Sequence, residues 1–374
     1  MKILYGLFCL IFLIVFHEFG HFIMAKICGV KVEAFSVGFG PVLFHKMIKG
    51  TDFRLSLIPL GGYCGMKGEK EFQDSLKAGL DHIQADSDSL YGVHPAKRIL
   101  IAFFGPFANF FFAFLCFTII ALTGYSYYSY SSKITLADEV YPEIHSAARE
   151  AGLESGDTIT KINGKTIETF SDIISEVVSR PDEDIKVTVD RNGEKKEFIV
   201  HSDLDKDSGA GKIGVTADTE SLQKYEMKRL SFFPALLQGL KESFNALGLT
   251  IKGIFTLFKG VNLNNAVSGP ARVVSLMGDV VNESFKTSFR EGLVNILNFI
   301  AFISISLCFM NLLPVPILDG GLILFALIEL VTCRKLSPKV LYYIQFIGLA
   351  FIAFLFILGL TGDIKYFFGL FKGV

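Results

Sequence analysis

His17, Glu18 and His21 carry the clearest chemical signal in the sequence, because they form a His-Glu-x-x-His pattern. On a helix, residues four apart share one face, so both imidazoles can bind one metal ion while Glu18 reaches a water molecule. Two core histidines and a surface glutamate are the alternative explanation. That explanation is unfavourable because the pattern lies inside an apolar segment, where an ionisable side chain at the bilayer centre costs about 2.5–3.5 kcal/mol. The pattern therefore predicts a metal-dependent hydrolase.

A catalytic zinc ion usually has three protein ligands and one open position, so a third ligand is expected elsewhere in the chain. Asp319 is the candidate, since it follows Pro314 and Pro316 at the end of another apolar segment. These prolines impose extended backbone, which is tolerated at membrane depth only inside protein or beside a wet cavity. An exposed aspartate in a turn at the membrane surface is the alternative.

The composition is that of a membrane protein: 51% of the 374 residues are hydrophobic, and the mean hydropathy is +0.46. Four apolar segments reach the roughly 20 residues that cross a bilayer. These segments are 3–27, 99–123, 293–313 and 340–360. The first is expected to be retained rather than cleaved as a signal peptide, because no small-residue cleavage site follows it. The net charge of −1 says nothing about nucleic acid, and no basic run suggests it, so no nucleic-acid partner is expected.

The stretches between the spans differ in pattern. Residues 30–60 alternate apolar and polar side chains between glycine and proline turns, which predicts short strands. Residues 67–94 are charged and are expected to form a cytosolic loop. The alternating segment 185–191 followed by Asn192-Gly193 predicts a β-hairpin in a small soluble domain. Residues 231–261 are apolar but interrupted by charges, which favours amphipathic helices on the membrane surface over a fifth span.

The chain therefore divides into four predicted regions. They are the first two spans with a membrane-associated β-hairpin (1–124), an α+β domain (125–222), amphipathic surface helices (223–292) and the last two spans with the aspartate motif (293–374). The predicted fold class is a multi-pass α-helical membrane protein with one extracytoplasmic domain.

Basic residues near the span ends predict the orientation. Lys97 and Arg98 precede the second span, and Arg334, Lys335 and Lys339 separate the third from the fourth, so both connections are expected in the cytosol. The domain at 125–222 is then outside, and both halves of the metal site lie towards the cytosolic side. A fifth span at 231–261 would invert the third span and would carry Asp319 to the opposite side.

Six motifs together resemble the site-2 protease family of intramembrane zinc metalloproteases, and within it the bacterial regulator of sigma-E proteases. They are His17–His21, Val37–Gly40, Ile58–Tyr63, Phe104–Asn109, Ser268–Pro270 and Asn311–Gly321. The resemblance implies Zn²⁺ bound by His17, His21 and Asp319, with Glu18 as the general base.

The same resemblance implies that Asn311 holds substrate; a polar residue that merely ends a helix is the alternative. Gly38 and Gly40 lie in the family's β-loop, which could pair with an unwound substrate strand, although these glycines could simply permit a turn. Residues 141–164 resemble a PDZ domain of bacterial proteases, in one copy where the best-known enterobacterial members have two. Such a domain would bind a peptide as an added strand or act as a steric gate.

The expected function is cleavage of single-span membrane proteins within the bilayer of the bacterial inner membrane. The resemblance implies anti-sigma factors or signal-peptide remnants as substrates. A metal transporter or sensor is an alternative, but it would need a continuous polar path across the spans. A catalytically inactive scaffold built on the PDZ-like domain is another, but it would not need Glu18 beside both histidines.

Overall fold

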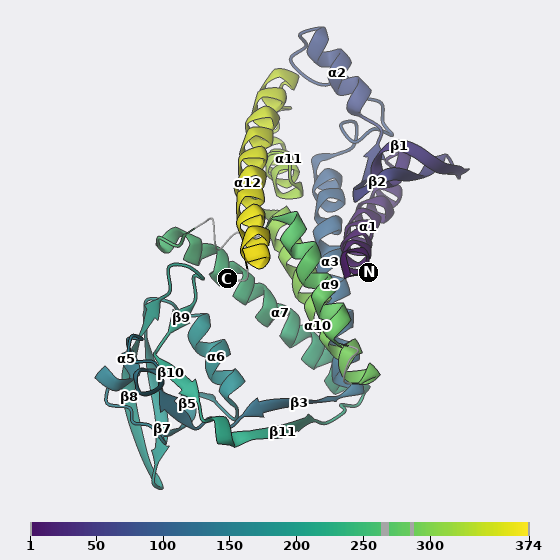
Figure 1. Cartoon of the computed structure of the whole chain (residues 1–374). Coiled ribbons are helices and arrows are strands. Elements are labelled where there is room, and N and C mark those ends of the chain that lie inside the picture. The colour runs from purple at the N-terminus through teal and green to yellow at the C-terminus, as the bar shows by residue number, and fades with distance from the viewer. Residues whose placement is uncertain (1, 263–268, 285–287, 373–374) are drawn as a thin grey trace. The chain divides into compact units, whose positions relative to one another are not determined.

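The computed structural model describes residues 2–262, 269–284 and 288–372, which form two compact units (Figure 1). The first unit comprises Met1–Leu122, Ser231–Leu247 and Ser268–Val374. The second comprises Thr123–Leu230 and Gly248–Val267.

The first unit is a bundle of helices around the four expected spans. Among the described residues, four helices are long and apolar enough to cross a membrane, as predicted. They are α1 (Lys2–Cys28), α3 (Pro95–Thr123), α10 (Phe289–Leu312) and α12 (Pro338–Lys372). Two shorter helices, α9 (Pro270–Ser284) and α11 (Asp319–Thr332), complete the bundle.

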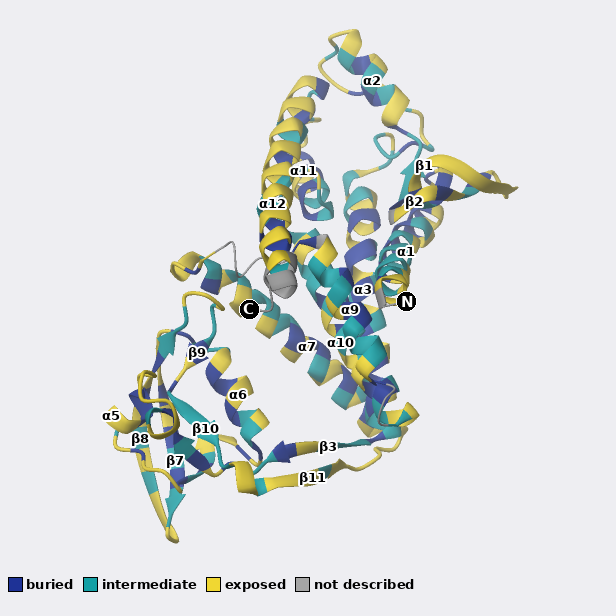
Figure 2. Cartoon of the chain, viewed as in Figure 1, coloured by how far each residue is buried: buried dark blue, intermediate teal, exposed yellow. Residues whose placement is uncertain are grey.

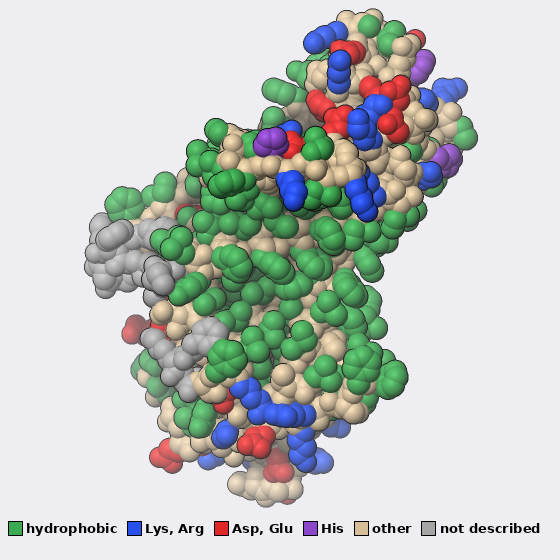
Figure 3. All heavy atoms as spheres, turned by 90° about the vertical axis from the view of Figure 1, so that its right-hand side faces the viewer, with side chains coloured by type: hydrophobic (Ala, Val, Ile, Leu, Met, Phe, Trp, Pro, Cys, Tyr) green, Lys and Arg blue, Asp and Glu red, His purple; other side chains and the backbone are tan. Residues whose placement is uncertain are grey.

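The outer faces of these helices are apolar and exposed. Much of the outer surface of α12 is coloured as exposed in Figure 2, although α12 is one of the most apolar helices. On the face drawn in Figure 3, hydrophobic side chains form a broad band over the helices, and charged side chains gather at the end that carries α2. Exposed apolar surface of this extent is typical of helices surrounded by lipid.

Strands β1 (Val32–Ile48) and β2 (Thr51–Met66) form the predicted hairpin. Its turn residues Lys49 and Gly50 both have positive φ, which is the geometry of a type I′ turn. The hairpin exposes a set of large apolar side chains: Phe39, Val42, Leu43, Phe44, Met47, Ile48, Leu55, Leu57 and Ile58.

The prediction of a loop throughout residues 67–94 is wrong for Glu69–Lys77, which form helix α2. Glu69 and Glu71 in its first turn and Lys77 in its last complement the helix dipole. Phe72 is buried in a small cluster with Phe325 and Leu341, and Leu76 packs against the same cluster, so two apolar side chains anchor an otherwise polar helix.

The second unit contains a five-stranded antiparallel sheet of order β6-β5-β7-β8-β9. Its strands are β5 (Thr158–Ile162), β6 (Lys165–Thr166), β7 (Glu183–Arg191), β8 (Glu194–Leu204) and β9 (Gly211–Lys212). Helix α6 (Phe170–Val178) begins with a capping box between Thr169 and Asp172. The predicted hairpin at Asn192-Gly193 is confirmed, because β7 pairs with β8 and both turn residues have positive φ.

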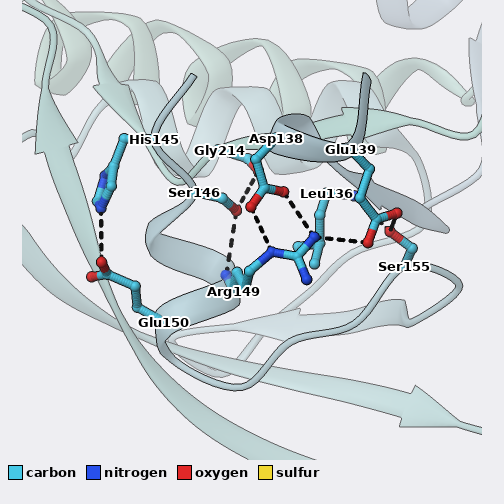
Figure 4. A network of polar contacts seen from close by, with 9 residues as sticks. All are labelled: Leu136, Asp138, Glu139, His145, Ser146, Arg149, Glu150, Ser155 and Gly214. Carbon is cyan, nitrogen blue, oxygen red and sulfur yellow. Dashed lines mark hydrogen bonds and ion pairs between the residues drawn. The ribbon is translucent and has the colours of Figure 1, made fainter. Parts of the chain in front are cut away.

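A polar network stabilises the surface of this unit (Figure 4). Arg149 of helix α5 (Ala147–Glu150) forms ion pairs with Asp138 and Glu139 of helix α4 (Ala137–Val140). The Arg149 guanidinium lowers the pKa of the Asp138 carboxyl. Ser146 caps α5 and also donates a hydrogen bond to the Gly214 carbonyl, just before strand β10 (Val215–Ala217). This network holds two short helices and one strand in a fixed arrangement.

The predicted region boundary at residue 222 must be moved to the end of the second unit's first segment, at Leu230. Strand β11 (Leu222–Met227) pairs along its whole length with β3 (Tyr125–Tyr130), so it belongs with the strands before it. The apolar segment that follows forms one helix, α7 (Phe232–Thr256), which is not among the four candidate spans. Strand β4 (Ile134–Leu136) pairs with β10 and completes the described sheets.

Candidate metal centre

The side chains of His17, His21 and Asp319 meet at one point within the first unit, with their ligand atoms within 4.8 Å of one another. Nε2 of His17 lies 3.1 Å from Oδ2 of Asp319, and Nε2 of His21 lies 3.3 Å from Oδ1 of the same carboxylate. The two Nε2 atoms are 3.2 Å apart. The structure therefore brings together the three residues that the sequence suggested as metal ligands.

Local backbone structure explains how residues so far apart in sequence converge. The two histidines lie one turn apart on α1, and both are buried. Asp319 is the first residue of α11, directly after the short break that follows α10. Gly320 permits this break, because a Cβ atom there would lie 2.3 Å from the Leu312 carbonyl oxygen. The end of α10 and the start of α11 can thus touch.

The spacing of the donor atoms fits zinc. Zinc bonds of about 2.0–2.2 Å at tetrahedral angles place neighbouring donor atoms about 3.3–3.5 Å apart. The 3.2 Å between the two Nε2 atoms is close to that value, and each of these nitrogens has its own Asp319 oxygen, at 3.1 and 3.3 Å. Two imidazole nitrogens and one carboxylate are also the donor types found in catalytic zinc sites, where a fourth position stays open.

A partner behind one histidine ring sets its orientation. Nδ1 of His21 lies 2.8 Å from the carbonyl oxygen of Ile101 in α3. A carbonyl can only accept, so Nδ1 carries the proton and Nε2 keeps its lone pair for a metal. The ring approaches α3 so closely that a Cβ atom at position 105 would lie 2.1 Å from Nε2, and only Gly105 leaves room for it.

Glu18 lies beside this centre and lines a cavity of about 590 Å³ together with all three ligand residues. Its Oε2 accepts a hydrogen bond of 3.0 Å from the backbone N–H of Cys64 in β2. The carboxylate is thereby tied to the hairpin, while Oε1 stays available. Burial, with a further contribution from Glu18, raises the pKa of the Cys64 thiol to about 12.

The same cavity extends to an ion pair between Arg98 at the start of α3 and Glu329 in α11. Glu329 is buried, and its other carboxylate oxygen accepts a hydrogen bond from the Leu336 backbone. This pair joins the two helices that carry Gly105 and Asp319, so it fixes the wall of the cavity beside the metal ligands.

Of the predicted substrate-binding residues, one lines the cavity and two do not. Asn311, near the end of α10, lines the cavity. Gly38 and Gly40 lie in β1, away from the residues that line it. Gly38 has a φ of +89°, and a Cβ there would lie 2.8 Å from the Ile58 carbonyl oxygen, so the hairpin itself requires glycine at this position. The role of these two glycines in substrate binding stays a prediction.

Several residues of the site gave no signal of their own in the sequence. Gly105 and the Ile101 carbonyl act through close approach to His21, which only the packing of α1 against α3 reveals. Gly105 and Asn109 both lie in the Phe104–Asn109 motif, but the motif assigned neither a role; the Asn109 amide lies against His17. A single asparagine in the middle of an apolar span is the signal that could have drawn attention to it.

With this geometry in view, the comparison with known families is decisive: residues 5–355 match the model described as Peptidase family M50. The chain belongs to peptidase family M50, the site-2 protease family. Full-length relatives agree with this assignment. The chain is 34% identical to a protein of Treponema pallidum over 98% of this chain and 100% of that protein. It is 36% identical to a protein of Campylobacter jejuni over 96% of this chain and 92% of that protein. The first is named "Putative zinc metalloprotease" and the second "Putative zinc metalloprotease Cj1068".

Membership of family M50 confirms the predicted resemblance and the predicted class of enzyme, a metalloprotease. It also agrees with the four candidate spans, so this M50 peptidase is a membrane protein. The donor set fits the zinc ion for which its relatives are named.

Proposed function

We propose that this M50 peptidase is an intramembrane zinc endopeptidase that cleaves the transmembrane segments of single-span proteins. The observation that carries the proposal is the convergence of two buried histidines, one aspartate and Glu18 around one cavity among helices suited to a bilayer. Polar groups at this depth are costly unless they have a function.

Zinc bound by His17, His21 and Asp319 would supply a Lewis acid for the scissile carbonyl and for the attacking water. Glu18 takes one proton from that water, whose oxygen then bonds to the carbonyl carbon. The hydrogen bond from Cys64 holds Oε2, which leaves Oε1 to receive the proton. The C–N bond then breaks, and Glu18 passes the proton to the leaving nitrogen, giving a carboxyl end and an amine end.

A transmembrane substrate must first unwind, because a helix hides its carbonyl groups in its own hydrogen bonds. Asn311 lines the cavity next to the break between α10 and α11, and its amide can bond to an extended substrate strand. The edge of the β1–β2 hairpin, with Cys64 beside Glu18, offers backbone groups for the same purpose. Gly38 and Gly40 would then affect substrate binding only indirectly, through the conformation that they give this hairpin.

The biological setting is part of the same proposal. The basic residues at the span ends favour an orientation with the cavity towards the cytosol and the second unit outside, and the proposed membrane is a bacterial inner membrane. Substrates would include single-span proteins already trimmed by another protease, such as anti-sigma factors, and the remnants of signal peptides. This is regulated intramembrane proteolysis.

We also propose that the second unit is a PDZ-like domain with a peptide groove. A hollow of about 560 Å³ lies between α6 and the segment Gly211–Thr216, and it is lined by Ile174 and Val178. Both side chains are exposed, with 50% and 43% of their surface accessible. An extended peptide added beside this segment would place its side chains against them.

The test compares wild-type protein with Glu18→Gln in detergent, using a tagged single-span substrate. The amide cannot take the proton, so the cleavage rate should fall by about 10²–10⁴-fold. Bound zinc, measured by metal analysis, should stay near one ion per chain because no ligand has changed. His17→Ala serves as the matched variant and should lose both zinc and cleavage. Equal cleavage by Glu18→Gln and wild type would contradict the mechanism.

A further inference from the structure

The two histidine ligands differ in what lies behind their rings. His21 faces the Ile101 carbonyl, which accepts only. His17 faces Asn109 of α3, whose Nδ2 lies 3.2 Å from Nδ1 of His17. A primary amide has both a donor and an acceptor end, so this partner does not by itself decide which ring nitrogen of His17 carries the proton.

The acceptor end of Asn109 has no partner. The residue is fully buried, at 0% exposure, and its Oδ1 has no hydrogen-bond partner within the part of the chain that the structure describes. A buried acceptor without a partner costs about 1–3 kcal/mol. Such a group inside a span therefore points to an interaction that the amide can make by turning.

The chemistry of the metal centre defines that interaction. For Nε2 of neutral His17 to bind a metal, the single ring proton must be on Nδ1, and its neighbour must then accept it. A half-turn of the amide about the Cβ–Cγ bond exchanges Oδ1 with Nδ2 and moves no other heavy atom. Oδ1 then accepts from Nδ1 of His17, and Nδ2 takes the position that Oδ1 held.

We propose that Asn109 is a positioning residue that accepts the Nδ1 proton of His17 and thereby keeps Nε2 of His17 available to the metal. The Ile101 carbonyl accepts the Nδ1 proton of His21 in the same way, but the side-chain amide of Asn109 can rotate and a backbone carbonyl cannot. This inference rests on the proposed zinc centre and deepens it, since it assigns the element that orients the second imidazole.

A second contact holds Asn109 in place. Its backbone carbonyl accepts a hydrogen bond of 2.8 Å from Oγ of Ser304 in α10, and both residues are fully buried. The bond fixes α3 against α10 at this level without involving the side-chain amide. Ser304→Ala therefore gives a matched control, because it perturbs the same helix contact and leaves the amide unchanged.

The experiment uses the full-length protein in detergent and measures zinc affinity by competition with a chelator. The visible absorption of the Co²⁺-loaded protein reports the geometry of the ligands independently of proteolysis. Asn109→Ala should bind zinc about 10–100-fold more weakly and should alter the Co²⁺ spectrum, since loss of a ligand's orienting partner has effects of this size. Asn109→Asp keeps an acceptor and should stay within about threefold of wild type, as should Ser304→Ala.

The proposal is overturned if Asn109→Ala keeps wild-type zinc affinity and the wild-type Co²⁺ spectrum. It is also overturned if Ser304→Ala weakens zinc binding as much as Asn109→Ala does, because the helix contact would then be responsible. If Asn109→Asp does not fold, the comparison of Asn109→Ala with Ser304→Ala still tests whether the amide supports zinc binding. His17→Ala distinguishes failure of the metal centre from failure of the Asn109 proposal. Retention of zinc by His17→Ala would reject the metal centre itself. Normal zinc binding by Asn109→Ala, with loss of zinc in His17→Ala, would reject only the role of Asn109.

Discussion

The two units of the chain use polar side chains in opposite ways. In the first unit, several buried polar contacts gather around the metal centre: the three ligand residues, Glu18 with Cys64, and Asn109 with His17. Another buried carboxylate, Asp363 in α12, accepts from the backbone of Gly269 and Ala271. In the second unit, many ion pairs lie on the surface, as in the partly exposed pairs of Arg149 with Asp138 and of Lys186 with Glu197, although Arg191 also pairs with the buried Asp157.

This difference follows from the surroundings. Exposed pairs compete with water and are worth about 0–1 kcal/mol, so many can form without a special role. A polar group within an apolar bundle costs several kcal/mol unless it is paired, so those that persist indicate function. Substitutions should therefore have large and specific effects in the first unit and small effects in the second.

Of the substitutions that contrast the two units, Gly105→Ala should have the largest effect. The new Cβ would lie 2.1 Å from Nε2 of His21, so the ring must leave the position from which it binds metal. Cleavage should fall by at least about 100-fold, and zinc affinity by at least about tenfold, as for other losses of ligand orientation. Gly248→Ala in α7 is the matched control, because a Cβ there meets no atom within 4 Å. Normal zinc binding by Gly105→Ala would show that His21 is not a ligand.

The next effect concerns stability rather than metal binding. The Arg98–Glu329 pair is nearly closed to solvent, with side-chain exposures of 13% and 7%. Glu329→Leu should leave Arg98 buried without its partner and destabilise the protein by about 3–5 kcal/mol. The double variant Arg98→Leu/Glu329→Leu should recover much of that loss, because both charges are then removed. Thermal unfolding in detergent measures both.

The comparison between units supplies the control for this pair. Lys186 and Glu197 are both more than half exposed, at 56% and 58%. Glu197→Leu should change stability by no more than about 1 kcal/mol. If Glu329→Leu and Glu197→Leu have similar effects, the contrast between buried and exposed pairs fails in this protein.

The sequence predicted those features that depend on periodicity and on residue type. Four apolar segments gave the spans, and two histidines four apart on a helix gave half of the metal site. Asp319 could be proposed because the break at Pro314 and Pro316 needed a reason to lie at membrane depth.

Features that depend on contacts between distant segments could not be predicted. The closeness of Gly105 to His21 is a property of how α1 and α3 pack, and no local pattern encodes it. The pairing of β11 with β3 joins strands about a hundred residues apart, which is why the boundary at residue 222 was misplaced. Helix α2 was missed because it is short and polar and depends on the packing of Phe72 and Leu76 against distant residues.

The smallest effect is expected at His145 on the surface of the second unit. Hydrogen bonds to Glu150 and then to Asp203 raise its pKa above the ordinary value of 6.5. A raised folded-state pKa means that the charged imidazole stabilises the unit fully below the ordinary value, and that this stabilisation is lost as pH rises through the folded-state pKa. The unfolding temperature of the wild type should therefore exceed that of His145→Gln by slightly more at about pH 5.5 than at about pH 8.5. Thermal unfolding of both full-length proteins at the two pH values measures the difference. An advantage for wild type that grows with rising pH would show that the neighbouring carboxylates do not act on His145, and the contrast between the units would have to be drawn elsewhere.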